Sequence, residues 1–110
     1  MATYTEITTI PEWENVLQQS KEKPVIVFKH STTCPISAAA YSEFTALETN
    51  ADAYIVKVIE SRPVSNEIES NLSIQHQSPQ AFVISNEQAV WNASHRNITQ
   101  ENITKALSEV

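Results

Sequence analysis

The sequence predicts an α/β protein with three layers, in which a mixed central sheet carries helices on both faces. Three observations support this class. Residues 25–28 (VIVF) form a short, β-branched apolar run, which is typical of a strand buried on both faces of a sheet. Segments with helical spacing of apolar residues separate this run from its neighbours, which favours parallel strands joined by right-handed crossovers. Two later strand-like runs follow one another closely, as in an antiparallel hairpin.

The first half of the chain alternates strand and helix. Thr9 and Glu12 form a capping box at the start of one helix, and Pro35 is placed to open another, since proline is favoured in a first turn. The inward-facing residues of this second helix are expected to include Ala39, Phe44 and Leu47. The expected elements are a strand at 4–7, a helix from 9 to about 20, a strand at 25–28 and a helix from 35 to about 50.

The second half ends in a hairpin and a helix. Asn86 would supply any positive φ in the hairpin turn, because the chain has no glycine, and Thr99 can cap the last helix. The expected elements are a strand at 53–59 that Arg62-Pro63 interrupts, a helix at 64–72, and strands at 81–84 and 89–91. This order is that of the thioredoxin-like architecture, and the pattern alone also fits other small α/β folds.

Composition limits the classes of function. The 110 residues suit one domain, 1–110, and the 41% hydrophobic content supports a packed core. A net charge of −6 argues against nucleic acid or an anionic membrane as partner, since both attract basic surfaces. The lack of glycine excludes Gly-rich phosphate loops. No apolar run approaches the ~20 residues that span a bilayer, and the first residues lack a signal-peptide pattern, so we expect a cytoplasmic protein. We also expect a monomer.

Cys34 is the only cysteine of the chain, which excludes an internal disulfide and a cysteine-rich zinc site. It follows a buried strand and a polar loop, and it directly precedes the helix that Pro35 opens. The free N–H groups of a first helical turn, and the helix dipole, stabilise an anion. No Asp or Glu occurs from 23 to 42, a window that contains Lys29 and His30. We therefore expect a reactive thiolate, against the alternative of an inert buried thiol.

Ser37 stands where a Cys-x-x-Cys motif has its second cysteine. The two positions share a face of the helix, so the Ser37 hydroxyl can donate a hydrogen bond to the Cys34 thiolate. The alternative is an ordinary polar residue of a first turn. Because a hydroxyl cannot attack a disulfide, a mixed disulfide at Cys34 must be resolved by a thiol from outside the chain.

Ser78-Pro79 directly precedes an apolar strand. A proline is permitted where a strand begins. In thioredoxin-like folds the equivalent proline is cis and faces the active cysteine, which leaves the backbone of the preceding residue free to pair with a bound chain. Only about 5–6% of X–Pro bonds are cis, so the sequence makes Ser78-Pro79 a candidate cis-proline loop without assigning the isomer.

Two segments, 28–37 (FKHSTTCPIS) and 78–82 (SPQAF), carry a resemblance to a known family. With them the chain resembles the monothiol bacilliredoxins, thioredoxin-like proteins of the bacillithiol system in Firmicutes, over nearly its whole length. The resemblance implies removal of bacillithiol from S-bacillithiolated client proteins. Cys34 would attack the mixed disulfide and carry bacillithiol until another bacillithiol, or a bacillithiol-disulfide reductase, frees it. Ser37 and Pro79 match the serine and the cis-proline of the family, and no metal or nucleotide is implied.

The sequence marks no residue for the sugar or the malate of bacillithiol. Lys29, His30 and Arg62 are candidates for binding its carboxylates, and Thr33 lies directly before the reacting thiol. Lone basic residues are more often only solvated.

Three other functions stay open. A binding module that kept the fold and lost catalysis would react no faster than a free thiol. A redox sensor would be capped by bacillithiol at Cys34 and release it slowly. Metal or cluster delivery would need a second thiol from a dimer or a cofactor, and the scattered histidines give no metal spacing.

Overall fold

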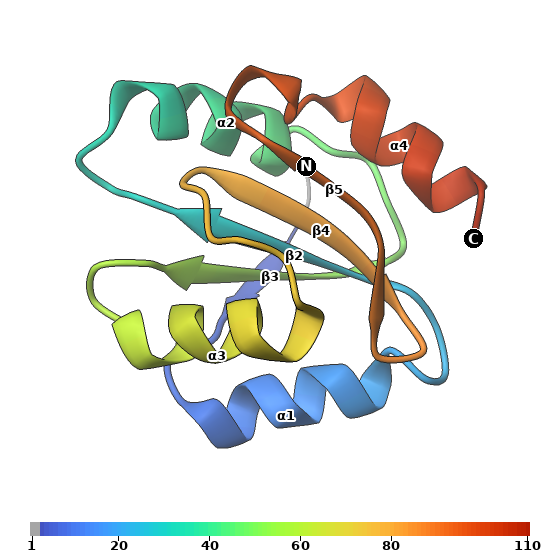
Figure 1. Cartoon of the computed structure of the whole chain (residues 1–110). Coiled ribbons are helices and arrows are strands. Elements are labelled where there is room, and N and C mark those ends of the chain that lie inside the picture. The colour runs from blue at the N-terminus through green and yellow to red at the C-terminus, as the bar shows by residue number, and fades with distance from the viewer. Residues whose placement is uncertain (1–2) are drawn as a thin grey trace.

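The fold is a mixed sheet between two pairs of helices (Figure 1). The computed structural model describes residues 3–110. Five strands lie in the order β1-β3-β2-β4-β5. They are β1 (Tyr4–Glu6), β2 (Val25–His30), β3 (Asp52–Lys57), β4 (Gln80–Ser85) and β5 (Gln88–Ser94). The helices are α1 (Ile10–Gln19), α2 (Pro35–Thr45), α3 (Arg62–Leu72), the short 3₁₀ helix η1 (His95–Asn97) and α4 (Gln100–Ser108).

The strand directions confirm the predicted α/β class. β3 pairs in parallel with β1 and with β2, whereas β4 pairs antiparallel with β2 and with β5. Helices α1 and α3 cover one face of the sheet, and α2 and α4 cover the other (Figure 1). No helix among residues 3–110 has both the length and the apolar character needed to cross a membrane.

Strand β2 lies at the centre of the sheet, and each of its residues is buried. Val25 and Val27 pack in the core beneath α1 and α3, whereas Ile26 and Phe28 pack in the core beneath α2 and α4. Because side chains alternate along a strand, the two polar residues that end β2 face opposite sides of the sheet. Residue 29 faces α3 and residue 30 faces α2. Of the two, only residue 30 therefore lies on the side of the sheet where α2 begins.

The local signals for helix starts and for the hairpin are confirmed. Thr9 and Glu12 form the reciprocal capping box of α1, and the Thr99 side chain accepts a hydrogen bond from the N–H of Asn102 at the start of α4. In the β4–β5 turn Asn86 has φ 53° as expected, and Glu87 also has a positive φ of 64°. Two positive φ values in succession are the geometry of a tight hairpin turn.

Three expectations for the helices are wrong. Helix α2 ends at Thr45 rather than near Asn50, because the N–H of Leu47 bonds to the carbonyl of Phe44 (3.3 Å) and tightens the last turn. Ala39 is exposed, and its neighbour Ala40 is buried instead. The strand expected at 53–59 already ends at Lys57, so the Arg62-Pro63 pair does not interrupt it. The pair forms the first turn of α3, which begins at Arg62 rather than at Val64, because a proline in a first turn needs no N–H partner.

Candidate active site

Cys34 is the N-cap residue of α2, with an extended backbone (φ −102°, ψ 123°). Its N–H donates to the carbonyl of Ser31 (3.3 Å), and its own carbonyl accepts from the N–H of Ala38 (3.0 Å). The side chain is half-buried and makes no capping hydrogen bond. The first turn of α2 contains no acidic residue. The thiol therefore lies at the positive end of a helix dipole, with its sulfur uncommitted and no carboxylate beside it in that turn.

The Ser37 hydroxyl is buried one turn below Cys34. Its oxygen accepts a hydrogen bond from the N–H of Ser31 (2.9 Å) and lies 2.7 Å from Nδ1 of His30. When Nδ1 carries no proton, the hydroxyl donates to it, and no hydrogen is left for a neighbouring sulfur. When Nδ1 carries the proton, the ring donates, and the hydroxyl can donate elsewhere. The tautomer of His30 therefore decides whether the Ser37 hydroxyl can donate a hydrogen bond to the Cys34 thiolate.

His30 is a buried ring and not a surface cation. It stacks on Phe28 and on Tyr41, with ring centroids 5.5 Å and 4.9 Å away, and 8% of the residue is exposed. Burial, and then the nearby Lys57 ammonium, hold the pKa of His30 below its ordinary value. The ring is therefore neutral at pH 7, so its contribution to the site is a hydrogen bond rather than a charge.

The Ser78–Pro79 peptide bond is cis. Strand β4 runs antiparallel to β2 with Gln80 opposite Lys29, which brings the loop before β4 beside the end of β2. The Pro79 carbonyl accepts a hydrogen bond from the N–H of His95 (3.1 Å). The Ser78 hydroxyl oxygen is buried, and it has no hydrogen-bond partner among residues 3–110.

Lys29 is fully buried on the other side of the sheet from His30. Its Nζ donates to the carbonyl of Ser65 (3.1 Å) and to Nδ1 of His76 (3.1 Å). Burial lowers the pKa of Lys29 to about 8, and the charge of Glu69 opposes that fall. A carboxylate oxygen of Glu69 also accepts from the backbone N–H of His76 (2.7 Å). Lys29 therefore joins β2 to α3 and to the segment before Pro79, and it does not reach the solvent near Cys34.

The remaining sequence candidates lie at the surface. Thr33 is exposed in the loop before Cys34, and its hydroxyl lies 3.4 Å from that of Ser31. Arg62 is exposed as the first residue of α3, on the face of the sheet opposite α2. The structure thus brings Thr33, Cys34, Pro35 and Ser37 together and directs Lys29 and Arg62 elsewhere. Within residues 3–110, no group of three or more His, Cys, Asp or Glu side chains is placed to share a metal ion.

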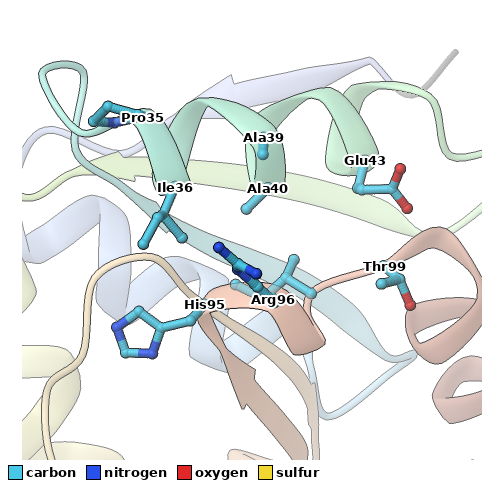
Figure 2. Close-up of a pocket in the computed structure, with 9 residues that line it drawn as sticks. Pro35, Ile36, Ala39, Ala40, Glu43, His95, Arg96 and Thr99 are labelled. Carbon is cyan, nitrogen blue, oxygen red and sulfur yellow. The ribbon is translucent and has the colours of Figure 1, made fainter.

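A pocket of about 460 Å³ opens beside the first turn of α2. Figure 2 shows residues of α2 along one side and residues of η1 and the start of α4 along the other. The lining residues are Pro35, Ile36, Ala39, Ala40, Glu43, His95, Arg96, Ile98 and Thr99. Sequence reasoning missed this pocket, because its two walls lie more than 50 residues apart in the chain and no local pattern joins them.

Comparison with known proteins gives one family and one fold. The family model described as monothiol bacilliredoxin BrxC matches residues 5–103. A solved structure described as a candidate oxidoreductase with a thioredoxin fold has 36% identity and a TM-score of 0.87, over 94% of this chain and 92% of that one. Mitochondrial thioredoxin 3 of Saccharomyces cerevisiae has 15% identity and a TM-score of 0.75, over 97% and 95% of the two chains. Schistosoma mansoni thioredoxin has 17% identity and a TM-score of 0.76, over 96% and 94%. At such identities the two thioredoxins show the shared fold alone.

Proposed function

The chain belongs to the monothiol bacilliredoxin family, and on that premise we propose that it removes bacillithiol from S-bacillithiolated proteins, with Cys34 as the nucleophile. One observation carries the proposal. The only cysteine of the chain is the N-cap of a helix whose first turn holds no acid. Such a position stabilises a thiolate, which is the species that attacks a disulfide.

The exchange conserves electrons at each step. The Cys34 thiolate attacks the bacillithiol sulfur of the client's mixed disulfide, a bond forms between these two sulfurs, and the client's sulfur leaves as a thiolate that takes a proton from water. With no second cysteine in the chain, a thiol from outside must attack next. A second bacillithiol releases Cys34 as a thiolate and forms bacillithiol disulfide. A separate reductase returns this disulfide to two thiols with two electrons from an external reductant and two protons. We assign the exchange to a monomer in the cytoplasm, where thiols are kept reduced.

The neighbouring residues have proposed roles in this exchange. Pro35 begins α2 and so fixes the helix end that faces the sulfur. Thr33 is exposed directly before Cys34, where it can contact an incoming substrate. Ser78 and Pro79 would meet the client chain, and the cis Ser78–Pro79 bond beside the end of β2 supports this role.

Intact mass spectrometry tests the proposed function. Reduced protein is mixed with a client peptide that carries bacillithiol, and Cys34→Ala is run in parallel. We expect wild type to gain one bacillithiol while the client loses it, and the variant to gain none. A wild-type protein that stays free, beside a client that stays capped, would refute debacillithiolation and favour the non-catalytic binding module. An adduct that forms but resists added bacillithiol would indicate a sensor.

A further inference from the structure

The pocket beside Cys34 follows one face of α2. Its residues on this helix are Pro35, Ile36, Ala39, Ala40 and Glu43. Their spacing of one, three or four positions places them on a single face over roughly 12 Å of helix. The buried side chains of Ala40 and Ile98 belong to the apolar lining. The end formed by Pro35 and Ile36 adjoins Cys34 in the chain, so a molecule bonded to the sulfur can enter the pocket from there.

The opposite wall is joined to the loop that contains the cis proline. The N–H of His95, the first residue of η1, donates to the carbonyl of Pro79 (3.1 Å). His95 itself has a positive φ of 55°, which turns the chain from β5 into η1. The pocket and the Ser78–Pro79 loop thus share a structural element. A disulfide substrate at Cys34 has two halves, and each of these two neighbouring features can receive one half.

The charged side chains of the pocket indicate which half of the disulfide substrate it can receive. Arg96 extends under α2 among the apolar side chains (Figure 2), and it forms no ion pair or hydrogen bond with any residue from 3 to 110. Glu43, at the far end, already accepts a hydrogen bond from the N–H of Gln100 (2.9 Å). The pocket therefore offers an unpartnered guanidinium, a group suited to bidentate binding of a carboxylate.

We propose that this pocket binds the bacillithiol half of the mixed disulfide, with Arg96 holding the malate carboxylates and the α2 face packing against the sugar. This assignment rests on the proposed debacillithiolation by Cys34, and it adds a binding site for the bacillithiol group that is transferred. The pocket volume of about 460 Å³ lies in the range of small-molecule sites. Arg96 is exposed, and an unpaired arginine that lines an apolar pocket next to the helix turn after Cys34 matches a small anionic thiol better than an uncharged one.

The test compares two caps on one client peptide. The peptide carries either bacillithiol or 2-mercaptoethanol, which has no carboxylate, and the rate of transfer to Cys34 is followed by intact mass. Arg96→Gln should slow transfer of bacillithiol about tenfold or more, as expected for loss of a charged hydrogen bond, and should leave transfer of mercaptoethanol within about twofold. Lys105→Gln, which removes an exposed cation of α4 outside the pocket, should change neither rate.

Two results overturn the proposal: Arg96→Gln that leaves both rates unchanged, or one that slows both equally. The second result would mean that Arg96 serves the client or the fold. A binding titration separates this inference from the proposed function. Glucosaminyl malate, which lacks the thiol, is added to Cys34→Ser protein, and the Arg96 side-chain resonance should shift. If wild type transfers no bacillithiol, debacillithiolation fails, whereas the shift still supports the pocket and its absence refutes it.

Discussion

The Ser37 hydroxyl lies 2.7 Å from Nδ1 of His30, and both residues are buried beneath the start of α2. The same oxygen accepts from the N–H of Ser31 (2.9 Å). One side chain thus joins the end of β2, the loop before Cys34 and the first turn of α2. The serine of this Cys-x-x-Ser segment therefore holds the loop that carries the thiol, whatever it also does for the sulfur.

Ser37→Ala should destabilise the protein and slow the reaction of Cys34. The change leaves the N–H of Ser31 and Nδ1 of His30 without their partner in a buried position, which costs about 1–3 kcal/mol. Urea unfolding measures the free energy of unfolding, and alkylation of Cys34 measures its reactivity. Ser42→Ala, at an exposed position of the same helix, is the control and should change the free energy by less than about 0.5 kcal/mol. Equal effects of the two changes would contradict the role of Ser37.

Ser37→Cys should allow the mixed disulfide at Cys34 to be resolved by a thiol of the same chain instead of a thiol from outside. Positions 34 and 37 lie on one side of the first turn, so a second thiol would be next to the mixed disulfide. The new thiolate would attack the Cys34 sulfur, release bacillithiol and leave a disulfide within the chain. Intact mass spectrometry should show the adduct decaying to a species about 2 Da lighter than the reduced variant, by loss of two hydrogens. A variant adduct as long-lived as that of wild type would show that a thiol at position 37 cannot reach the sulfur.

The features that the sequence predicted are those with local signals. The capping box of Thr9 and Glu12 and the proline at position 35 each act within one helical turn, so the starts of α1 and α2 and the N-cap position of Cys34 follow from neighbouring residues. The end of α2 has no such signal, since neither a glycine nor a proline stands near Thr45. Its position depends on how the chain turns back toward β3.

The rest of the site depends on contacts between distant residues. The partners of Lys29 are 36 and 47 positions away, so the sequence suggested a surface cation where the fold buries one. The alternation of β2 gave a usable hint, because it placed Lys29 on the face opposite Phe28. Arg96 was not predicted at all: only the packing of η1 against α2 brings it beside the first turn.

The free energy of unfolding of the wild-type protein should rise between about pH 8 and 10.5, and Lys29→Met should abolish this rise. Burial lowers the pKa of Lys29 from 10.5 to about 8. Below pH 8 the ammonium is protonated in both states, and the folded protein carries the whole cost of burying it. Between these values the unfolded chain binds more protons than the folded one, so the free energy of unfolding rises with pH. The shift corresponds to about 3 kcal/mol at most.

Urea unfolding of wild type and Lys29→Met at pH 7, 8.5 and 10 measures this rise as a difference between the two proteins. Burial and the charge of Lys29 hold the pKa of His76 below 6.5, so this ring is neutral over the whole range. Lys105→Met, which removes an exposed lysine, should retain the wild-type rise. A constant difference between wild type and Lys29→Met at all three pH values would mean that Lys29 does not titrate in this window.

Ser78→Ala should move stability and exchange in opposite directions. The hydroxyl is buried without a hydrogen-bond partner among residues 3–110, and an unsatisfied buried hydroxyl costs about 1–3 kcal/mol. Its removal should therefore leave the free energy of unfolding unchanged or raise it. If the hydroxyl rotates about χ1 to bond to a bound client chain, the rate of bacillithiol transfer to Cys34 should fall about fivefold to tenfold, as expected for the loss of one hydrogen bond of about 1 kcal/mol or more.

Urea unfolding and the intact-mass transfer assay, run on the same preparations, measure both quantities. Ser70→Ala, at an exposed position of α3, is the matched control and should alter neither. A fall in both stability and rate would mean that the Ser78 hydroxyl supports the fold through a partner of its own. An unchanged rate would mean that the Ser78 hydroxyl does not contact the substrate. The client would then bind only to the backbone beside Pro79, because a β-strand partner needs only main-chain donors and acceptors.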